Sequence, residues 1–220
     1  MKPVSKRRSN KLRRAESTHA VEKAACRLFV ERGFRSTSMD LIAREVGMTK
    51  GAIYFYYKDK NALLLHILKK SQSEFSGKIF SAIDDKSGAP SDQIDIFLDT
   101  IIWVGGELDQ YLLLLPVVMA TEFKGRGDDV ETAVKDIYEQ MYQKLSDVII
   151  SGQNNGEFGS ELPTRSLATM IVALTDGLLL EIYRQSSAVS GKEIGRAARV
   201  MVTNLLEITN GVKAPTNTLE

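Results

Sequence analysis

Hydroxyl groups, aromatic rings and amines are concentrated between Thr49 and Lys58, a stretch that contains neither Asp nor Glu. Hydroxyl and ammonium groups donate hydrogen bonds to phosphate oxygens, and Lys also donates to the edge of guanine. The run Tyr54-Phe55-Tyr56 cannot place all three rings on one side of a helix, so some of them must face outward. This segment therefore has the chemistry of a surface that binds nucleic acid.

Residue types typical of enzymes and metal sites are sparse in this chain. His19 and His66 lie far apart and have no neighbouring metal ligands in the sequence. No nucleophile signature surrounds Cys26, which as the single cysteine also excludes an internal disulfide. The run Gly125-Arg126-Gly127 is too short for a phosphate-binding loop. We therefore expect no catalytic residue, no metal site and no cofactor.

The net charge of +1 conceals a strong asymmetry along the chain. Residues 1–60 contain fifteen Lys and Arg against six Asp and Glu, a net charge of +9, so residues 61–220 carry −8. Residues 1–14 alone contain seven basic residues, no acid and almost no apolar side chain, and we expect them to form a disordered basic arm. This arm is either a solubilising tail or a DNA contact. The asymmetry assigns polyanion binding to the first part of the chain.

Apolar residues recur at spacings of three and four along most of the sequence, which is the period of an amphipathic helix. No segment shows the sustained alternation of a strand, and runs rich in Gly, Asn and Pro separate the helical patterns. The predicted helices are 16–33, 37–46, 49–58, 60–79, 91–109, 111–123, 129–153, 164–186 and 191–210. The predicted fold class is therefore all-α.

The second and third predicted helices have the features of a helix-turn-helix. Ala43 is small enough for a close helix crossing, Gly47 suits the turn, and the apolar residues that would fill the space between the helices are Ile42, Val46, Met48 and Ile53. Thr37 is the expected N-cap of the first helix of the pair, with Asp40 three residues later. An ordinary helical hairpin is the alternative, and the exposed hydroxyls and amines favour DNA binding.

The segment from Gly33 to Lys60, with Ile42-Ala43-Arg44-Glu45-Val46-Gly47-Met48-Thr49-Lys50-Gly51-Ala52-Ile53-Tyr54 at its centre, resembles the signature of the tetracycline-repressor (TetR) family. The resemblance covers roughly residues 16–65. It implies that the operator-contacting residues are Ser38, Thr49, Lys50, Gly51, Ala52, Tyr54, Phe55, Tyr56 and Lys60, with Tyr54 and Lys60 contacting phosphates. Two positions depart from the family pattern: Tyr57 replaces the usual phenylalanine, and Phe55 stands where a polar residue is frequent.

The resemblance also implies the domain organisation. A three-helix DNA-binding domain, residues 15–62, would be followed by a larger helical domain, residues 63–210, that dimerises and holds a small-molecule ligand. Residues 211–220 would form a flexible tail.

The pattern of residues 164–186 is apolar nearly all round, which indicates burial on two faces. We expect a partner helix from a second subunit to cover one face, in a four-helix interface. The predicted interface residues are Leu174, Leu178, Ile182, Ala198, Met201 and Leu205. The alternative is a helix buried at the centre of a monomer.

A set of large, adaptable side chains in the larger domain is the candidate ligand pocket: Trp103, Tyr111, Met119, Phe123, Tyr138, Met141, Tyr142 and Asp176. Such residues also serve as ordinary core. Glu107, Glu122 and Asp176 interrupt apolar patterns, and they either meet a cationic or hydroxylated ligand or form caps and ion pairs. The expected inducer is apolar or amphipathic.

These features together predict a homodimeric repressor that binds a palindromic site in double-stranded DNA. A small-molecule inducer would release the repressor from this DNA. An activator, or a DNA-binding protein whose larger domain binds another protein, stays open as an alternative, whereas an enzyme is disfavoured. No signal segment and no run of about eighteen apolar residues stands out in the sequence, so we expect a cytoplasmic protein without a membrane partner.

Overall fold

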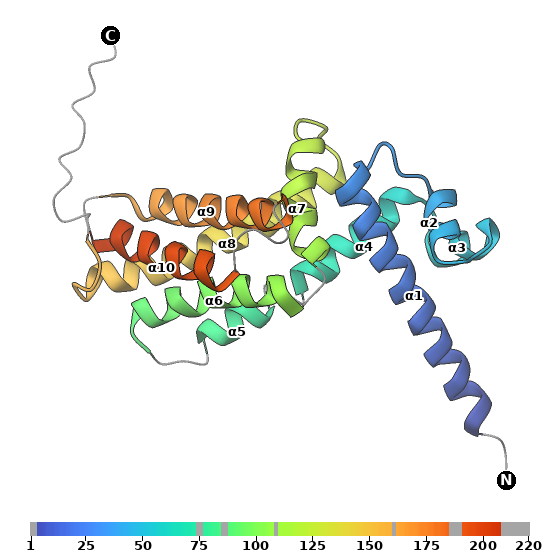
Figure 1. Ribbon diagram of the computed structural model, residues 1–220, viewed down its shortest axis with the longest axis horizontal. Helices are drawn as coiled ribbons and strands as arrows, with labels where there is room; N and C mark the ends of the chain where they lie inside the picture. The colour runs from blue at the N-terminus through green and yellow to red at the C-terminus, as the bar shows by residue number, and fades with distance from the viewer. Residues whose placement is uncertain are drawn as a thin grey trace. The chain divides into compact units, whose positions relative to one another are not determined.

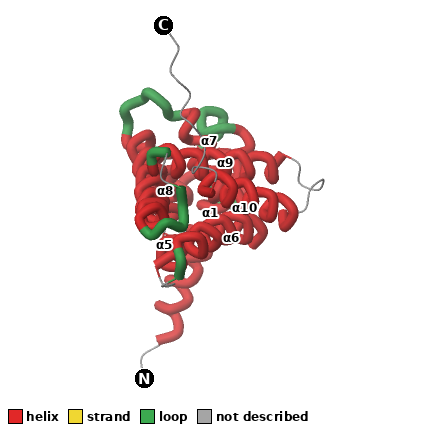
Figure 2. The backbone as a smooth tube through the Cα atoms, turned by 90° about the vertical axis from the view of Figure 1, so that its left-hand side faces the viewer, coloured by secondary structure: helices red, strands yellow, loops and turns green. Residues whose placement is uncertain are grey.

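The computed structural model describes residues 4–73, 77–84, 88–107, 110–159, 162–184 and 191–207. Across these ranges the regular elements are α-helices and no strand occurs, which confirms the all-α prediction (Figure 1, Figure 2). The helices are α1 (Val4–Arg32), α2 (Met39–Glu45), α3 (Lys50–Tyr56), α4 (Lys60–Ser71), α5 (Gly77–Asp84), α6 (Pro90–Glu107), α7 (Gln110–Glu122), α8 (Asp129–Asn154), α9 (Thr164–Arg184) and α10 (Gly191–Glu207).

The chain divides into two compact units whose boundaries differ from the predicted domains. The first unit comprises Met1–Glu74 and Asp109–Asp136, and the second comprises Phe75–Leu108 and Ile137–Glu220. Helix α7 therefore belongs to the unit that contains the helix-turn-helix, although the sequence placed it in the larger domain of residues 63–210. Sequence order could not show this, because the segment returns to the first unit only after α5 and α6.

Helix α1 is the centre of the first unit, where it packs against α2, α4 and α7. Its buried residues Val21, Ala25 and Phe29 recur at a spacing of four, so they form one apolar stripe along the helix. Helix α4 supplies Leu63, Leu64, Ile67 and Leu68, and α7 supplies Leu114, Leu115 and Met119, all of them buried. Burial of this stripe against three helices fixes the core on which α2 and α3 rest.

Two predicted helix boundaries are corrected by the structure. Helix α1 begins at Val4, within the segment 1–14 that was expected to be disordered. Lys and Arg are good helix formers, and no Gly or Pro interrupts the chain from Val4 to Arg32, so the helix extends beyond its buried part. The predicted helix 60–79 ends instead at Ser71, and α5 starts anew at Gly77. Residues 74–76, between these two helices, lie outside the described residues.

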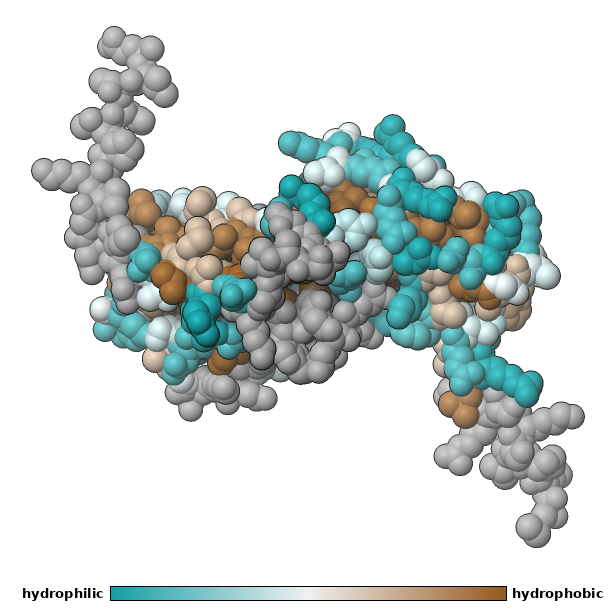
Figure 3. Space-filling view, viewed as in Figure 1, coloured by the Kyte–Doolittle hydropathy of each residue, from teal (hydrophilic) through white to brown (hydrophobic). Residues whose placement is uncertain are grey.

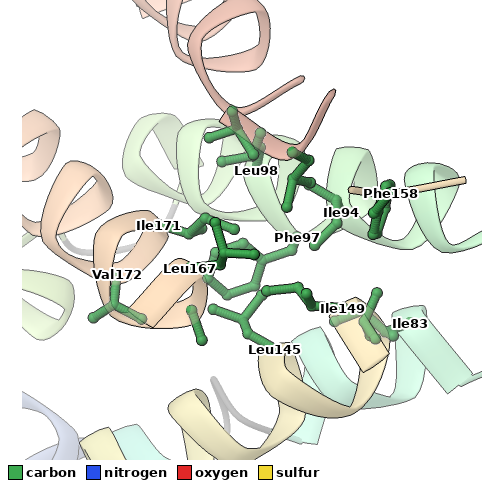
Figure 4. Close-up of a cluster of buried hydrophobic side chains, with 14 of the residues drawn as sticks. Ile83, Ile94, Phe97, Leu98, Leu145, Ile149, Phe158, Leu167, Ile171 and Val172 are labelled. Carbon is green, nitrogen blue, oxygen red and sulfur yellow. The ribbon is translucent and has the colours of Figure 1, made fainter. Parts of the chain in front are cut away.

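The second unit has its own apolar core, formed by α5, α6, α8, α9 and α10. Phe97 of α6, Leu145 of α8 and Leu167 of α9 are almost completely buried and converge in this cluster (Figure 4). Burial of such side chains contributes about 1.5–3 kcal/mol each relative to full exposure. The second unit therefore carries a core independent of the helix-turn-helix.

Candidate nucleic-acid interface

Helices α2 and α3 and the turn between them form the predicted helix-turn-helix. Gly47 adopts a positive φ of 67°, which a residue with a side chain rarely adopts, and the N–H of Met48 donates to the carbonyl of Ala43 at 2.8 Å. Ile42, Ala43, Ile53 and Tyr57 are buried. The local pattern of small, glycine and apolar residues thus fixes the angle between the two helices.

Two hydroxyl side chains cap these helices at their exposed starts. Ser38 Oγ accepts from the N–H of Leu41 at 3.1 Å, and Thr49 Oγ1 accepts from the N–H of Ala52 at 3.3 Å. Each hydroxyl keeps its own proton, which can be donated to a DNA phosphate. The cap predicted at Thr37 is wrong, because Thr37 is buried and its hydroxyl donates to the carbonyls of Leu28 and Gly33.

The outward face of α3 carries most of the predicted DNA contacts. Lys50, Gly51, Tyr54 and Phe55 are exposed, whereas Ala52 and Tyr56 are half-buried. Lys50 Nζ lies 2.9 Å from Oδ2 of Asp40, and the hydrogen bond and charge of Asp40 raise the pKa of Lys50. Because exposed ion pairs of this kind are weak, a phosphate or a guanine edge can replace Asp40 as the partner of this protonated amine.

Sequence analysis placed Arg14 in the basic arm but did not predict its position beside α3. Its guanidinium lies over the Phe55 ring, 5.2 Å from the centroid, and 5.9 Å from the centroid of Tyr56. The two rings meet edge to face at 5.6 Å. Phe55, which is 70% exposed, thus supports a cation on α1. The basic character of residues 1–14 was compatible with DNA binding in the sequence analysis. Because these residues were expected to be disordered, no contact between Arg14 and another residue was predicted.

Lys60 lies in a different environment from the phosphate contact that the resemblance implied. Its ammonium donates to the carbonyls of Phe34 and Thr37, each at 2.6 Å, and lies 4.1 Å from the centroid of the Phe34 ring. Burial lowers the pKa of Lys60, although the nearby carboxylate of Glu122 opposes that effect. The side chain therefore holds the loop between α1 and α2 in the DNA-free protein.

The predicted pocket residues are divided between the two units. Tyr111, Met119 and Phe123 belong to the first unit: the Tyr111 hydroxyl donates to Glu31 at 2.7 Å, Met119 is buried, and Phe123 meets the Phe34 ring edge to face at 5.0 Å. The Trp103 and Glu107 side chains lie outside the described residues. Tyr111, Met119 and Phe123 thus belong to a different unit from the other described members of the set.

The other four predicted pocket residues lie together in the second unit. The Tyr138 hydroxyl donates to Oδ2 of Asp176 at 2.9 Å, the rings of Tyr138 and Tyr142 are 6.2 Å apart, and Met141 packs against the same core. Burial raises the pKa of Asp176 to about 6, and the hydrogen bond from Tyr138 only partly opposes this shift. The carboxyl of Asp176, hydrogen-bonded to the Tyr138 hydroxyl, can in its ionised form bind a cation or accept a hydrogen bond from a ligand.

The predicted interface residues differ in exposure. Ala198 is buried within the chain, so it does not lie on the exposed surface of α10, where a second subunit would bind. Leu174, Leu178, Ile182 and Leu205 are half-buried. Met201 is 58% exposed, and the similarly exposed Met170 and Val200 were not among the predicted interface residues. The exposed apolar residues of α9 and α10 are thus only partly the same as the predicted interface residues.

No group of three His, Cys, Asp or Glu side chains that would suit a metal ion occurs among the described residues. The described surface of α3 instead combines hydroxyls, amines and rings. This arrangement suits the major groove of DNA, whose base edges and flanking phosphates accept and donate hydrogen bonds.

Two family models match the sequence. Residues 23–67 match the model described as bacterial regulatory proteins, tetR family, and residues 118–186 match the model described as tetracyclin repressor-like, C-terminal domain. The first match contains α2, α3 and most of α4, which form the surface described above. The second match begins within α7 and ends after α9.

Solved and curated proteins resemble the chain over most of its length. The MbdR regulator from Azoarcus sp. CIB is 32% identical, with a TM-score of 0.79 over 86% of this chain and 97% of that chain. The transcriptional repressor DhaR of Mycobacterium sp. (strain GP1) is 27% identical over 74% of this chain and 80% of that protein. AibR, solved with isovaleryl coenzyme A and operator DNA, is 18% identical with a TM-score of 0.69, covering 84% and 97% of the two chains, and shares the fold.

Proposed function

The chain belongs to the tetR family of bacterial regulatory proteins, and from this premise we propose that it is a homodimeric repressor that a small molecule releases from a palindromic operator. Membership makes it a DNA-binding transcriptional regulator. The observation that carries the proposal is the outward face of α3, which presents hydroxyls, an amine and aromatic rings without an acid.

The proposed operator contacts divide into two kinds. Lys50 reads base edges, and Thr49, Tyr54 and Ser38 donate to phosphates that fix the orientation of α3 in the major groove. Gly51 and Ala52 let the start of α3 approach the bases closely, and Tyr56 supports Phe55 at the rim of the surface. In a dimer, the two copies of α3 would meet half-sites about 34 Å apart.

The exposed apolar surface of the second unit supports a homodimer. Only 28% of the most apolar eighteen-residue window of α9 is buried within the chain, and Met170, Val200 and Met201 are exposed on α9 and α10. Apolar side chains gather over these two helices at the left of Figure 3. A contiguous apolar surface of this kind is typical of a protein interface, and a second copy would bury it in a two-fold arrangement.

Helix α9 is also long and apolar enough to cross a membrane by length and composition alone. We assign its apolar surface to the subunit interface, because the acidic Asp176 lies within the helix and the family consists of DNA-binding regulators. A cytoplasmic location and the lack of an enzymatic activity are part of the same proposal.

The proposed ligand site lies around Tyr138, Met141, Tyr142 and Asp176. Two rings and a thioether suit an apolar body, and the carboxylate suits a cationic or hydroxylated end. AibR was solved with an acyl coenzyme A, which shows that this fold accommodates an amphipathic ligand in that protein. The alternative is that the second unit binds another protein through its apolar surface.

Selection of DNA from a random pool tests the proposal directly. We expect enrichment of a palindrome whose half-sites are spaced by about one helical turn. Lys50→Ala should weaken binding and relax the base preference at one position of each half-site. Failure of the parent protein to enrich any sequence would contradict sequence-specific binding. A non-palindromic site would contradict the homodimer.

A further inference from the structure

We propose that Glu122 and Lys60 clamp the loop 33–37 between α1 and α2, and that operator affinity depends on this clamp. Both are positioning residues in this scheme, because they act on DNA through the loop and α2. The inference rests on the proposed operator binding. It adds a determinant of operator affinity that lies outside the helix-turn-helix. We call the two residues and the loop backbone that they hold the loop clamp.

Glu122, the last residue of α7, holds one side of the loop. Its Oε2 accepts from the N–H of Phe34 at 2.8 Å, and its Oε1 accepts from the N–H of Arg35 at 3.0 Å. Gly33 beside them has a φ of 81°, so the chain turns sharply where the carboxylate binds. Hydrogen bonds to a charged acceptor are about twice as strong as neutral ones, and this carboxylate fixes two successive peptide groups.

Lys60, the first residue of α4, holds the carbonyl groups of the same loop. Its ammonium donates to Phe34 and Thr37 and lies over the Phe34 ring. The peptide groups of Phe34 thus have their N–H bound by α7 and their carbonyl bound by α4. A carboxylate on its N–H groups and an ammonium on its carbonyl groups leave the loop little freedom to move without breaking charge-assisted hydrogen bonds.

Phe34 anchors the clamp in the core of the first unit. Its ring is buried between Phe29 of α1, at a centroid distance of 5.3 Å, and Phe123, at 5.0 Å. Thr37 at the other end of the loop is buried and bonded to α1. Ser38, the N-cap of α2, follows directly, so the position of the loop sets the start of the helix on which α3 is stacked.

The clamp also joins the two parts that the family models describe. Phe34 and Lys60 lie within residues 23–67, whereas Glu122 lies within residues 118–186. The structure places all three in the same compact unit. Glu122 is thus a contact through which the C-terminal part of the chain determines the geometry of the DNA-binding part.

The variant Glu122→Gln distinguishes the positioning role of Glu122 from the effect of its negative charge on DNA binding. Removal of an acid favours DNA binding on electrostatic grounds, whereas loss of the clamp weakens operator binding, so the two effects have opposite signs. We expect operator affinity to fall about tenfold while affinity for scrambled DNA stays unchanged or rises. Asp129→Asn, at the exposed start of α8 in the same unit, removes the same charge and serves as the control. Equal operator affinity of Glu122→Gln and the control would overturn the proposal.

Lys60→Met distinguishes a positioning residue from a phosphate contact. Each phosphate contact contributes about 0.9 to the slope of the logarithm of affinity against the logarithm of salt concentration. A positioning role predicts weaker operator binding with an unchanged slope. A slope that falls by about one in Lys60→Met would reassign Lys60 to the phosphate backbone and overturn its part in the clamp.

Amide hydrogen exchange in the DNA-free protein tests the clamp without reference to the operator. Glu122→Gln should accelerate exchange at Phe34 and Arg35 at least tenfold and leave the buried turns of α1 unchanged. Unchanged exchange at both amides would overturn the clamp even if the protein binds its operator. Accelerated exchange in a protein that selects no DNA would instead retain the clamp and contradict the proposed function.

Discussion

The hydroxyl of Tyr57 donates a 2.8 Å hydrogen bond to Oε1 of Glu22, a carboxylate that is only 6% exposed. The same oxygen lies 2.9 Å from Nε2 of His66, and Lys70 Nζ lies 2.7 Å from Oε2. Burial raises the pKa of Glu22, but the hydrogen bonds from Lys70 and Tyr57 outweigh it and leave the pKa lowered. Tyrosine at this position, where phenylalanine is usual in the family, thus ties the end of α3 to α1.

Tyr57→Phe should lower the free energy of unfolding by about 1–2 kcal/mol, because a buried acceptor loses one of its donors while the ring still fills its site. Lys70 keeps the carboxylate paired, so the loss stays in this range. Urea denaturation followed by circular dichroism measures the change. Tyr54→Phe, which removes an exposed hydroxyl from α3, is the control and should alter stability by less than about 0.5 kcal/mol. Equal effects of the two substitutions would show that the Glu22 contact adds nothing to stability.

Asp176 should make the protein less stable as pH rises from about 4 to about 6. Burial raises the pKa of this carboxyl to about 6 in the fold, above its ordinary value of 3.8, so within this window the native state binds a proton that the unfolded state has released. Stability therefore falls with rising pH, and the ionised form costs at most about 3 kcal/mol at neutral pH.

Asp176→Asn tests this dependence by removing the titration while keeping an oxygen for the Tyr138 hydroxyl. The variant should match the parent at pH 4 and exceed it in stability at pH 7.5, as measured by thermal denaturation in a pH series. Asp136→Asn, at an exposed position on α8, is the control for a general change in charge. A difference between Asp176→Asn and the parent that does not vary with pH would rule out the titration of Asp176.

Arg14 and Phe55 should act as one unit in DNA binding. The cation lies over the exposed ring, so removal of either partner releases the guanidinium from its position beside α3. Arg14→Ala should weaken operator binding about three- to tenfold and reduce the salt slope by about one. Phe55→Ala should weaken binding by a smaller factor, and the double variant should lose little more than Arg14→Ala alone.

A double-mutant cycle on operator affinity measures this coupling. Lys23→Ala, at an exposed position farther along α1, is the control for loss of a positive charge. If the effects of Arg14→Ala and Phe55→Ala simply add, Phe55 contacts DNA by itself and does not support Arg14.

Met201→Glu should prevent dimer formation, because it places a charge in the proposed interface of α9 and α10. The side chain is already exposed within the chain, so the fold of the subunit should be retained. Analytical ultracentrifugation should show a monomer, and operator affinity should fall at least tenfold because one subunit reaches only one half-site. Ile150→Glu replaces an exposed apolar residue of α8 and should leave the dimer intact. A Met201→Glu protein that sediments as the parent does would place the interface elsewhere.

Local sequence patterns determined the all-α fold and the helix-turn-helix. Helical periodicity depends on residues three and four apart, and the turn depends on Gly47 and its immediate neighbours, so a short window of sequence contains the required information. The resemblance to the TetR family rests on the same short window. The outward direction of Tyr54 and Phe55 follows from the burial of Ile53, because the next two residues of a helix point away from it.

Only the tertiary structure decided which distant residues meet. Lys60 and Glu122 bind the same loop from positions 26 and 88 residues away from Phe34, and Arg14 lies over a ring on a different helix. The division of the predicted pocket between two units and the burial of Ala198 also arise from packing. Such contacts depend on which helices pack against each other. The periodicity of one helix shows which of its faces is buried, but it does not identify the helix that covers that face.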